Sequence, residues 1–270
     1  MSIINTNNTS PLRYPGGKTR ACKIIDEIIR QHFNLDNFDT LISPFFGGGS
    51  FELYFQNKYK YKLCVNDKFI PLYNFWYQVK TDKHTLSQEL RKIKNITKEN
   101  FSNYRDTIMQ LNNDTLQQAI QYFIINRCSF SGATLSGGFS LEASSKRYTP
   151  SSIDRIEKLD LSSVEIFNYD FEYFIETYAN DSSIIFLDPP YYLNKNSRLY
   201  GNNGDLHEDF DHKKLFDIIV TKKNWLITYN NCEYIRNLYK DYKIIYVEWT
   251  YGMNKSKESS EIIILSNDIN

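Results

Sequence analysis

The stretch SIIFLDPPY, residues 183–191, indicates the fold of this chain. Its first five residues form a short, mostly apolar run, which is typical of a strand buried on both faces. Strands of that kind belong to parallel sheets with helices on both sides. In an open sheet of this type the carboxyl ends of the strands face the ligand crevice, so we expect Asp188 to lie there.

Around this strand the chain alternates between strand and helix patterns. Further buried strands are expected at 39–45, 61–67, 164–170, 224–229, 242–248 and 261–266. Helical patterns lie between them at 19–33, 50–58, 69–79, 171–179, 211–221 and 233–240. This alternation predicts an α/β fold with a mostly parallel sheet.

Residues 80–160 break the alternation. They hold polar helical stretches at 85–95, 97–111 and 114–126. The Gly-, Ser- and Thr-rich segment 129–150 follows and resembles a hairpin or loop. The simplest organisation is one α/β domain made from 1–75 and 160–270, with 76–159 as an inserted domain.

Composition excludes several classes of protein. The 270 residues are 41% hydrophobic and 16% aromatic, enough for a sizeable core. No apolar run approaches the roughly 18 residues that span a membrane, and the first residues lack a secretion signal, so neither a span nor secretion is expected. The four cysteines, Cys22, Cys64, Cys128 and Cys232, form no CxxC pair and indicate a reducing intracellular compartment such as the cytoplasm.

The charge is neutral in sum but uneven along the chain. Residues 1–160 hold 21 Lys and Arg against 15 Asp and Glu, whereas residues 161–270 hold 11 against 17. A basic half can present a surface to an anionic partner, although scatter of surface charge explains it equally well. Because the insertion is only mildly basic, we expect modest, salt-sensitive nonspecific affinity for any nucleic acid.

The sequence Asp188-Pro189-Pro190-Tyr191 has the chemistry of a site for a planar amine. The two prolines fix the backbone and remove two N–H donors, which leaves carbonyl acceptors beside the carboxylate. Asp188 and the Pro189 carbonyl can accept both N–H bonds of an exocyclic amine while Tyr191 stacks on its ring. The structural alternative is a tight turn that ends the strand.

The segment Phe45-Phe46-Gly47-Gly48-Gly49-Ser50 follows the first expected strand and opens a helix. Its glycines let a ligand approach the backbone, and a flexible turn is the alternative. Glu52 replaces the third glycine of a dinucleotide fingerprint, which disfavours a nicotinamide oxidoreductase. Asp67 ends the next strand, eighteen residues after Gly49, where an acidic residue holds ribose hydroxyls in nucleotide-type folds.

The segment Tyr14-Pro15-Gly16-Gly17-Lys18-Thr19 ends like a phosphate-binding loop. We reject that interpretation because Leu12 stands where the loop needs its first glycine and no strand precedes it. A turn leading into the 19–33 helix is one interpretation. The other is a carboxylate site made by Lys18 and backbone amides near a helix N-terminus.

Taken in order, these motifs resemble those of the Dam-type (D12 class) adenine-N6 DNA methyltransferases. The matching segments are 14–18, 45–50, 66–67, 126–127, 170–171, 188–191, 210–212 and 228–230. They span almost the whole chain, and the ordered set is far more specific than any single motif. The resemblance implies the S-adenosylmethionine-dependent methyltransferase fold, a mostly parallel seven-stranded sheet with an antiparallel last strand, and target recognition in a helical or hairpin insertion.

The resemblance also implies a site and a reaction on double-stranded DNA. The expected S-adenosylmethionine contacts are Tyr14, Lys18, Phe46, Gly47, Gly49, Asp67, Asp170, Phe171 and Asp188. Tyr14 and Lys18 would meet its methionine end, Asp67 its ribose, and Asp170 with Phe171 its adenine. Asp188, Pro189, Pro190 and Tyr191 would receive a target adenine flipped out of the duplex, at a cost of roughly a few kcal/mol.

The expected mechanism is direct methyl transfer. Adenine N6 is a poor nucleophile because its lone pair is delocalised into the ring. Hydrogen bonds from N6–H to Asp188 and the Pro189 carbonyl would favour a pyramidal amine aimed at the sulfonium methyl. No covalent cysteine is required, and the scattered histidines His32, His84, His207 and His212 predict no metal site.

The insertion supplies the candidate DNA contacts. Arg127, Lys146 and Arg147 are candidates for phosphate contacts, with ordinary solvated charge as the alternative. Phe130 aligns with an aromatic residue that the family wedges near the flipped base; a core position is its alternative. Ser131 is a further candidate contact, but Ser131 and Leu135 replace the Asn and Arg of GATC-reading members, so GATC specificity does not transfer.

Other functions stay open at this point. Cytosine-N4 methylation uses the same pair of acceptors. Methyltransferases for RNA or protein amides usually carry Asn rather than Asp before the prolines. A non-catalytic DNA-binding module would not need the glycines and Asp67. A cognate restriction endonuclease is a candidate partner.

Overall fold

The computed structural model describes residues 7–14, 16–111, 114–132, 134–192, 210–250 and 258–268. Its centre is a seven-stranded sheet in the order β3-β2-β1-β4-β5-β7-β6. The strands are β1 (Thr40–Ser43), β2 (Lys62–Asn66), β3 (Val164–Phe167), β4 (Ser183–Leu187), β5 (Trp225–Asn230), β6 (Lys243–Thr250) and β7 (Glu258–Leu265). Strands β1 to β5 are parallel to one another, and β7 runs antiparallel to its two neighbours, β5 and β6. This confirms the expected mostly parallel sheet with an antiparallel last strand.

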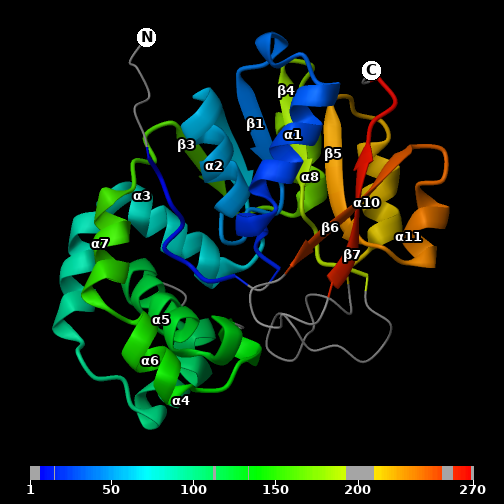
Figure 1. Cartoon of the computed structure of the whole chain (residues 1–270). Helices are drawn as coiled ribbons and strands as arrows, with labels where there is room; N and C mark the ends of the chain where they lie inside the picture. Colours follow the sequence, from blue (N-terminus) through cyan, green and yellow to red (C-terminus); the bar gives the residue numbers. More distant parts are fainter. Residues whose placement is uncertain are drawn as a thin grey trace.

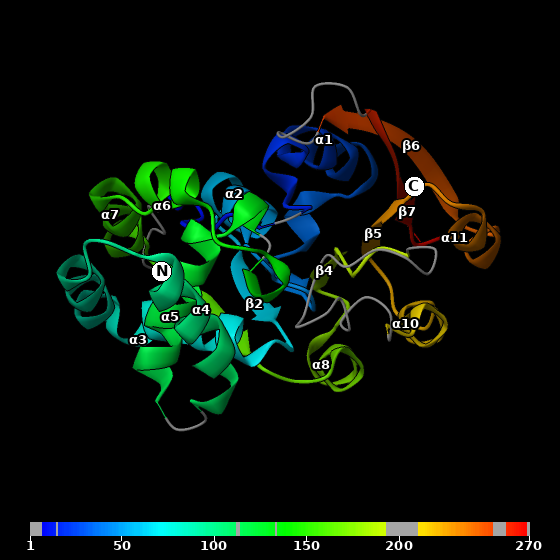
Figure 2. The same cartoon turned by 90° about the horizontal axis from the view of Figure 1, so that it is seen from below.

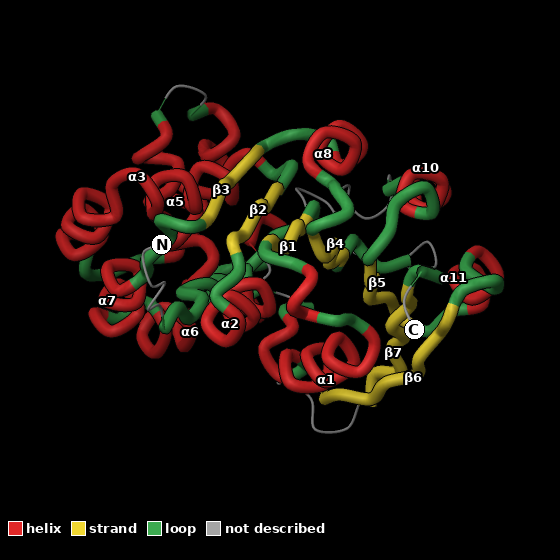
Figure 3. Tube along the Cα trace, turned by 90° about the horizontal axis from the view of Figure 1, so that it is seen from above, coloured by secondary structure: helices red, strands yellow, loops and turns green. Residues whose placement is uncertain are grey.

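Helices cover both faces of the sheet, as Figures 1 and 3 show. On one side lie α1 (Cys22–His32) and α2 (Ser50–Tyr59), and on the other α8 (Phe171–Tyr178), α10 (His212–Ile219) and α11 (Glu233–Leu238). Along β5, Trp225, Ile227 and Tyr229 belong to the core under α8, α10 and α11, whereas Leu226 belongs to the core on the opposite side. Alternate residues of a strand point to opposite faces, so a strand buried on both must be apolar throughout.

The segment between β2 and β3 is helical and lies beside the sheet (Figures 1 and 2). It consists of α3 (Ile70–Lys92), α4 (Lys98–Thr107), α5 (Thr115–Cys128), α6 (Leu141–Arg147) and α7 (Pro150–Lys158). Helix α3 passes through the expected domain boundary at 75/76, and its backbone leaves helical geometry only at Asp82, with φ −153° and ψ 64°. Side chains of α3 and α5 share one continuous core with α1 and α2.

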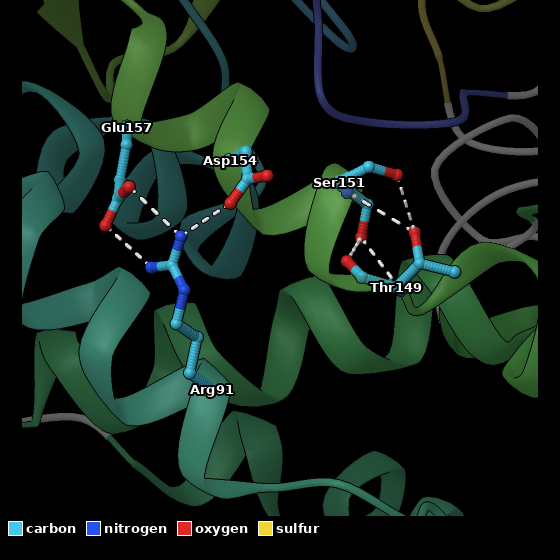
Figure 4. Close-up of polar contacts among 6 residues, drawn as sticks. Arg91, Thr149, Ser151, Asp154 and Glu157 are labelled. Carbon is cyan, nitrogen blue, oxygen red and sulfur yellow. Dashed lines mark hydrogen bonds and ion pairs between the residues drawn. The ribbon is translucent and has the colours of Figure 1, made fainter.

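The far end of α3 is joined to α7 (Figure 4). Arg91 donates to Asp154 at 2.6 Å and to the two carboxylate oxygens of Glu157 at 2.6 and 3.0 Å. Thr149 caps α7, because its hydroxyl accepts the Ser152 amide at 3.3 Å. The ion pairs of Arg91 thus join the end of α3 to α7, and the Thr149 cap defines where α7 begins.

The Gly- and Ser-rich segment 129–150 differs from the hairpin or loop expected for it. An isolated antiparallel bridge joins Ser129 to Phe139, and between them lie two short 3₁₀ helices. Helix α6 follows, begun by Ser140, whose hydroxyl accepts the Ala143 amide at 3.1 Å. The loop prediction for 141–147 is therefore wrong, because a capped helix forms there. None of the helices that the structure describes is long and apolar enough to cross a membrane.

Candidate functional site

The site forms where the strand order reverses. Within the sheet, β2 and β3 lie on one side of β1, whereas β4 and β5 lie on its other side. Loops at the carboxyl ends of two strands diverge at such a point and leave a crevice. Here these loops are the glycine loop (residues 45–49) after β1 and the segment 188–192 after β4. The sequence-predicted residues at both loops are thus brought to one edge of the sheet.

Asp188 is held by two side chains. The ammonium of Lys18, only 2% exposed, lies 2.7 and 2.9 Å from the two carboxylate oxygens. Thr228 on β5 donates its hydroxyl to Asp188 Oδ1 at 2.6 Å. The side chain of Asp188 remains 22% exposed. A carboxylate fixed by two donors and still open to the crevice is a preorganised hydrogen-bond acceptor.

Tyr191 lies beside this pair. The Lys18 ammonium is 4.9 Å from the centre of its ring, a cation–π contact. Its hydroxyl donates to the carboxylate of Glu261 on β7. Pro189 is buried and Pro190 half-buried. Lys18, which was predicted to meet the cofactor, therefore lies in contact with Asp188 and Tyr191, which were predicted to receive the target base.

The glycine loop is tightly built around Tyr14. Gly47 and Gly49 have φ of +51° and +65°, which side-chain-bearing residues rarely adopt. A Cβ on Gly48 would lie 2.7 Å from the Cβ of Tyr14, so only glycine lets Tyr14 approach. Trp76 of α3 donates its indole N–H to the Gly47 carbonyl at 2.9 Å. Sequence reasoning missed Trp76, since nothing local connects it to a loop 29 residues away.

Asp67 closes the other side of the glycine loop. Its carboxylate accepts the amides of Gly47 at 2.9 Å and Phe69 at 3.0 Å. Burial raises the pKa of Asp67 to about 6, against the effect of those two hydrogen bonds. The neighbouring Asn66 donates to the carbonyls of Pro44 and Tyr169, both at 3.1 Å, and accepts the Tyr169 amide at 2.7 Å. The ends of β1, β2 and β3 are therefore joined through one buried amide.

Asp170 and Phe171 begin α8 next to Asp67. Asp170 caps the helix by accepting the Glu172 amide at 3.1 Å, and it pairs with Lys68 at 2.9 Å. Although burial opposes the shift, the hydrogen bonds from Lys68 and the Glu172 amide lower the pKa of Asp170. The Phe171 ring lies 5.8 Å from that of Phe45 and 5.4 Å from that of Phe210. These three rings form an apolar wall suited to a planar ring.

Glu52 adds a buried acid beneath the site. It lies in α2, is 3% exposed and accepts the Ser43 hydroxyl at 2.7 Å. Burial raises its pKa to about 8, the Ser43 hydrogen bond opposes the shift, and the charge of Asp188 adds to it. The sequence marked Glu52 only as a departure from the dinucleotide fingerprint and gave it no role.

The predicted DNA contacts occupy different environments. Arg127 is 8% exposed and donates to the carbonyls of Arg147 at 2.8 Å and Pro11 at 3.2 Å. This placement does not support a phosphate contact, because its guanidinium joins three segments of the fold instead. Lys146 is exposed and pairs with Glu142 at 3.0 Å, and Arg147 is half-buried.

The predicted residues between α5 and α6 separate into exposed and buried positions. Phe130 is 68% exposed, so its alternative as a core residue is wrong. Leu135 is 5% exposed and packs in the core. The side chain of Ser131 lies outside the described residues, as do Pro15 and the segment containing His207.

The side chains around the crevice fit a ligand in which a charged amino acid is joined to a nucleoside. Lys18 offers a cation for a carboxylate, Asp67 an acceptor for hydroxyls, and the wall of Phe45, Phe171 and Phe210 a surface for a purine. The described residues contain no group of His, Cys, Asp and Glu side chains arranged to hold a metal ion. The roles assigned to individual residues remain predictions.

Comparison with known proteins identifies what the chain is similar to. The family model for D12 class N6 adenine-specific DNA methyltransferases matches residues 14–253. The Type II methyltransferase M.MjaIII of Methanocaldococcus jannaschii is 27% identical over 205 residues, which cover 69% of this chain and 70% of that protein. The Type II methyltransferase M.CviBI of Paramecium bursaria Chlorella virus NC1A is 24% identical over 237 residues, 86% of each chain.

The comparison with solved structures also gave a distant match. It is the catalytic domain of hMettl16 in complex with the MAT2A 3'UTR hairpin 6. The match has a TM-score of 0.43 and 9% identity, and covers 98% of this chain and 77% of that chain.

Proposed function

Since the chain belongs to the D12 class N6 adenine-specific DNA methyltransferase family, it is a DNA methyltransferase, and we propose how its residues carry out the reaction. The methyl donor in this proposal is S-adenosylmethionine, whose sulfonium supplies an activated methyl group. The observation that carries the proposal is the contact of Asp188 with Lys18 and Thr228 at the reversal of the strand order.

The cofactor would lie across the loops that end β1, β2 and β3. Lys18, beside Tyr14, would hold its carboxylate, and Asp67 would accept its ribose hydroxyls. Phe46, Gly47 and Gly49 would line it, while Asp170 and Phe171 would contact its adenine. Support comes from the Gly47 amide on Asp67 and the close approach of Tyr14 to Gly48, which give this loop one defined shape.

The target amine would bind at Asp188. Asp188 and the Pro189 carbonyl would accept its two N–H groups, and Tyr191 would stack on its ring. Thr228 keeps the carboxylate oriented through a 2.6 Å hydrogen bond, so the acceptor needs no rearrangement when the base arrives. Catalysis on this proposal rests on position and electrostatics.

The helical segment 76–159 would recognise the DNA and help to flip the base. The exposed Phe130 supports this, since an aromatic ring that is 68% exposed can stack on bases. Lys146 and Arg147 are the proposed phosphate contacts, and Ser131 is a further proposed DNA contact. Because the relatives are named Type II methyltransferases, a cognate restriction endonuclease is the proposed partner of the system.

The test is to incubate the protein with unmethylated DNA and labelled S-adenosylmethionine and to map modified bases by sequencing. We expect label on adenine N6 at a defined sequence. Asp188→Ala should abolish transfer while cofactor binding, measured by calorimetry, partly survives. Label on cytosine N4 would favour that alternative. Cofactor binding without label in DNA, or near-normal turnover of Asp188→Ala, would contradict the proposal.

A further inference from the structure

Three side chains on one face of the sheet hold the segment 188–192. Thr228 and Asn230 are two residues apart on β5 and therefore point to the same face. Glu261 on β7 is the direct partner of Asn230 in the antiparallel register, and directly opposed residues share a face. The strand spacing and the register thus make neighbours of three side chains, those of Thr228, Asn230 and Glu261.

Each of the three binds a different group of the segment. Thr228 donates to the Asp188 carboxylate at 2.6 Å, and Asn230 donates to the Tyr192 carbonyl at 2.8 Å. Glu261 accepts the hydroxyl of Tyr191. The acceptor carboxylate, the backbone and the ring of the proposed base site are therefore fixed separately.

Glu261 stands out among these three because the sheet itself gives no reason for an acid there. The residues that follow it in β7, 262–265, are apolar and buried, and Glu261 is 1% exposed. Burying a carboxylate is strongly unfavourable unless hydrogen-bond donors compensate. The Tyr191 hydroxyl is such a donor, and it belongs to the site rather than to the core.

The hydrogen bond determines where the Tyr191 ring lies. A tyrosine ring turns about two torsions, and fixing its hydroxyl at Glu261 restricts both. The Lys18 ammonium lies 4.9 Å from the centre of that ring. A ring held at its hydroxyl and contacted by a cation presents a defined plane to an incoming base.

We propose that Glu261 is a positioning residue, whose carboxylate holds the Tyr191 ring in the plane on which the flipped target base stacks. This rests on the proposed function, because it assigns Tyr191 to the target base. In this proposal Glu261 acts on the target base through the tyrosine hydroxyl and takes no part in the chemical step.

The test compares Glu261→Ala, Glu261→Gln, Tyr191→Phe and the double variant Glu261→Ala/Tyr191→Phe. Removing either partner should lower kcat about tenfold and leave the Kd for S-adenosylmethionine within about twofold. The double variant should lose no more than either single variant, because both remove one interaction. Glu261→Gln keeps an acceptor oxygen and should recover most of the activity. 2-Aminopurine at the mapped target position should fluoresce more in complexes of the Ala and Phe variants, since a less ordered ring stacks on the base less well.

A matched control exists in the same chain. Tyr59, the last residue of α2, donates its hydroxyl to the buried Asp26 of α1, so Tyr59→Phe removes the same kind of bond at the end of α2 that lies away from the glycine loop. It should lower Tm and leave kcat unchanged. If Glu261→Ala does not fold, Tyr191→Phe and Glu261→Gln decide the question.

The outcomes separate the two proposals. Full kcat in Glu261→Ala or in Tyr191→Phe, or losses that multiply in the double variant, would overturn the positioning role while the methyltransferase assignment stands. A wild-type protein that binds the cofactor and transfers no methyl group to DNA would instead overturn the proposed function.

Discussion

The ammonium of Lys18 lies 2.7 Å from Asp188 Oδ1 although the two residues are 170 positions apart in the chain. The same ammonium donates to the carbonyl of Gly16 at 2.9 Å. A residue from the start of the chain thus helps to fix the acceptor that follows β4. The proposed cofactor site and the proposed base site share this one cation.

Replacing Lys18 by Met keeps the length of the side chain and removes the charge. We expect S-adenosylmethionine to bind about 10- to 100-fold more weakly, because the cofactor carboxylate loses its cation. Titration calorimetry measures this directly. Lys23 in α1 is exposed, and Lys23→Met is the control that should bind normally. Equal affinities of the two variants for S-adenosylmethionine would contradict a contact between Lys18 and the cofactor.

Glu52→Gln should change how stability depends on pH. The folded chain holds the Glu52 proton up to about pH 8, whereas the ordinary pKa is 4.5. Between these values the folded state binds more protons than the unfolded state, so the stability supplied by Glu52 falls as pH rises. Gln cannot ionise and still accepts from Ser43. Urea unfolding should therefore show equal stability near pH 5 and a variant more stable by on the order of a few kcal/mol near pH 9. Parallel stability curves would contradict the burial of an ionisable Glu52.

Asp67 should make cofactor binding sensitive to acid. Its pKa is raised to about 6, so a proton neutralises the carboxylate as pH falls through that value. A neutral carboxyl is a weaker acceptor for ribose hydroxyls, and we expect affinity to fall about tenfold between pH 7 and pH 5. Asp67→Asn should bind about tenfold more weakly at pH 7 and show no such fall. A wild-type affinity that is flat over this range would contradict a ribose contact.

Gly48→Ala tests the fit of Tyr14 against the glycine loop. The added Cβ would lie 2.7 Å from the Cβ of Tyr14, so Tyr14 must move. We expect a loss of about 1–3 kcal/mol of stability and weaker cofactor binding. Gly138→Ala is the matched control, because a Cβ there meets nothing within 4 Å. Chemical unfolding and calorimetry of both variants give the comparison, and equal behaviour would mean that the loop tolerates a displaced Tyr14.

Phe130→Ala should affect DNA and leave the fold intact. The ring is 68% exposed, so its removal costs little stability. If it stacks near the flipped base, methylation should slow about tenfold at subsaturating DNA. Phe139, whose ring lies 5.6 Å from that of Phe101, provides the contrast, since Phe139→Ala should lower Tm. Unchanged methylation in Phe130→Ala would show that the ring does not contribute to DNA recognition or base flipping.

The central strands were predictable because they are buried on both faces. An apolar run such as 183–187 has few alternatives, and the chemistry at its end places Asp188 at the crevice. Helix α6 was missed although its signals are present, since Ser140 caps it and Lys146 and Arg147 end it. The many small polar residues of the segment 129–150 are typical of loops, and they led to a loop prediction where a short helix forms.

The contacts between distant segments were not predictable in the same way. Glu261 meets Tyr191 only because β7 inserts between β5 and β6, and a single sequence does not give that register. The buried Arg127 donates to the carbonyl of Pro11, 116 positions earlier. Charge and residue type suggested a surface contact, whereas the pairing of remote segments determined the environment.

The hydrogen bond from Trp76 to Gly47 has a consequence for exchanging recognition modules between relatives. A chimera joined at 75/76 would bring a foreign helix against the glycine loop and break that bond. A junction at Asp82, where α3 leaves helical geometry, would keep the first part of the helix with the methyl-transferring half. The transferable unit of specificity therefore begins at the kink, several residues after the boundary that the break in the strand and helix alternation suggested.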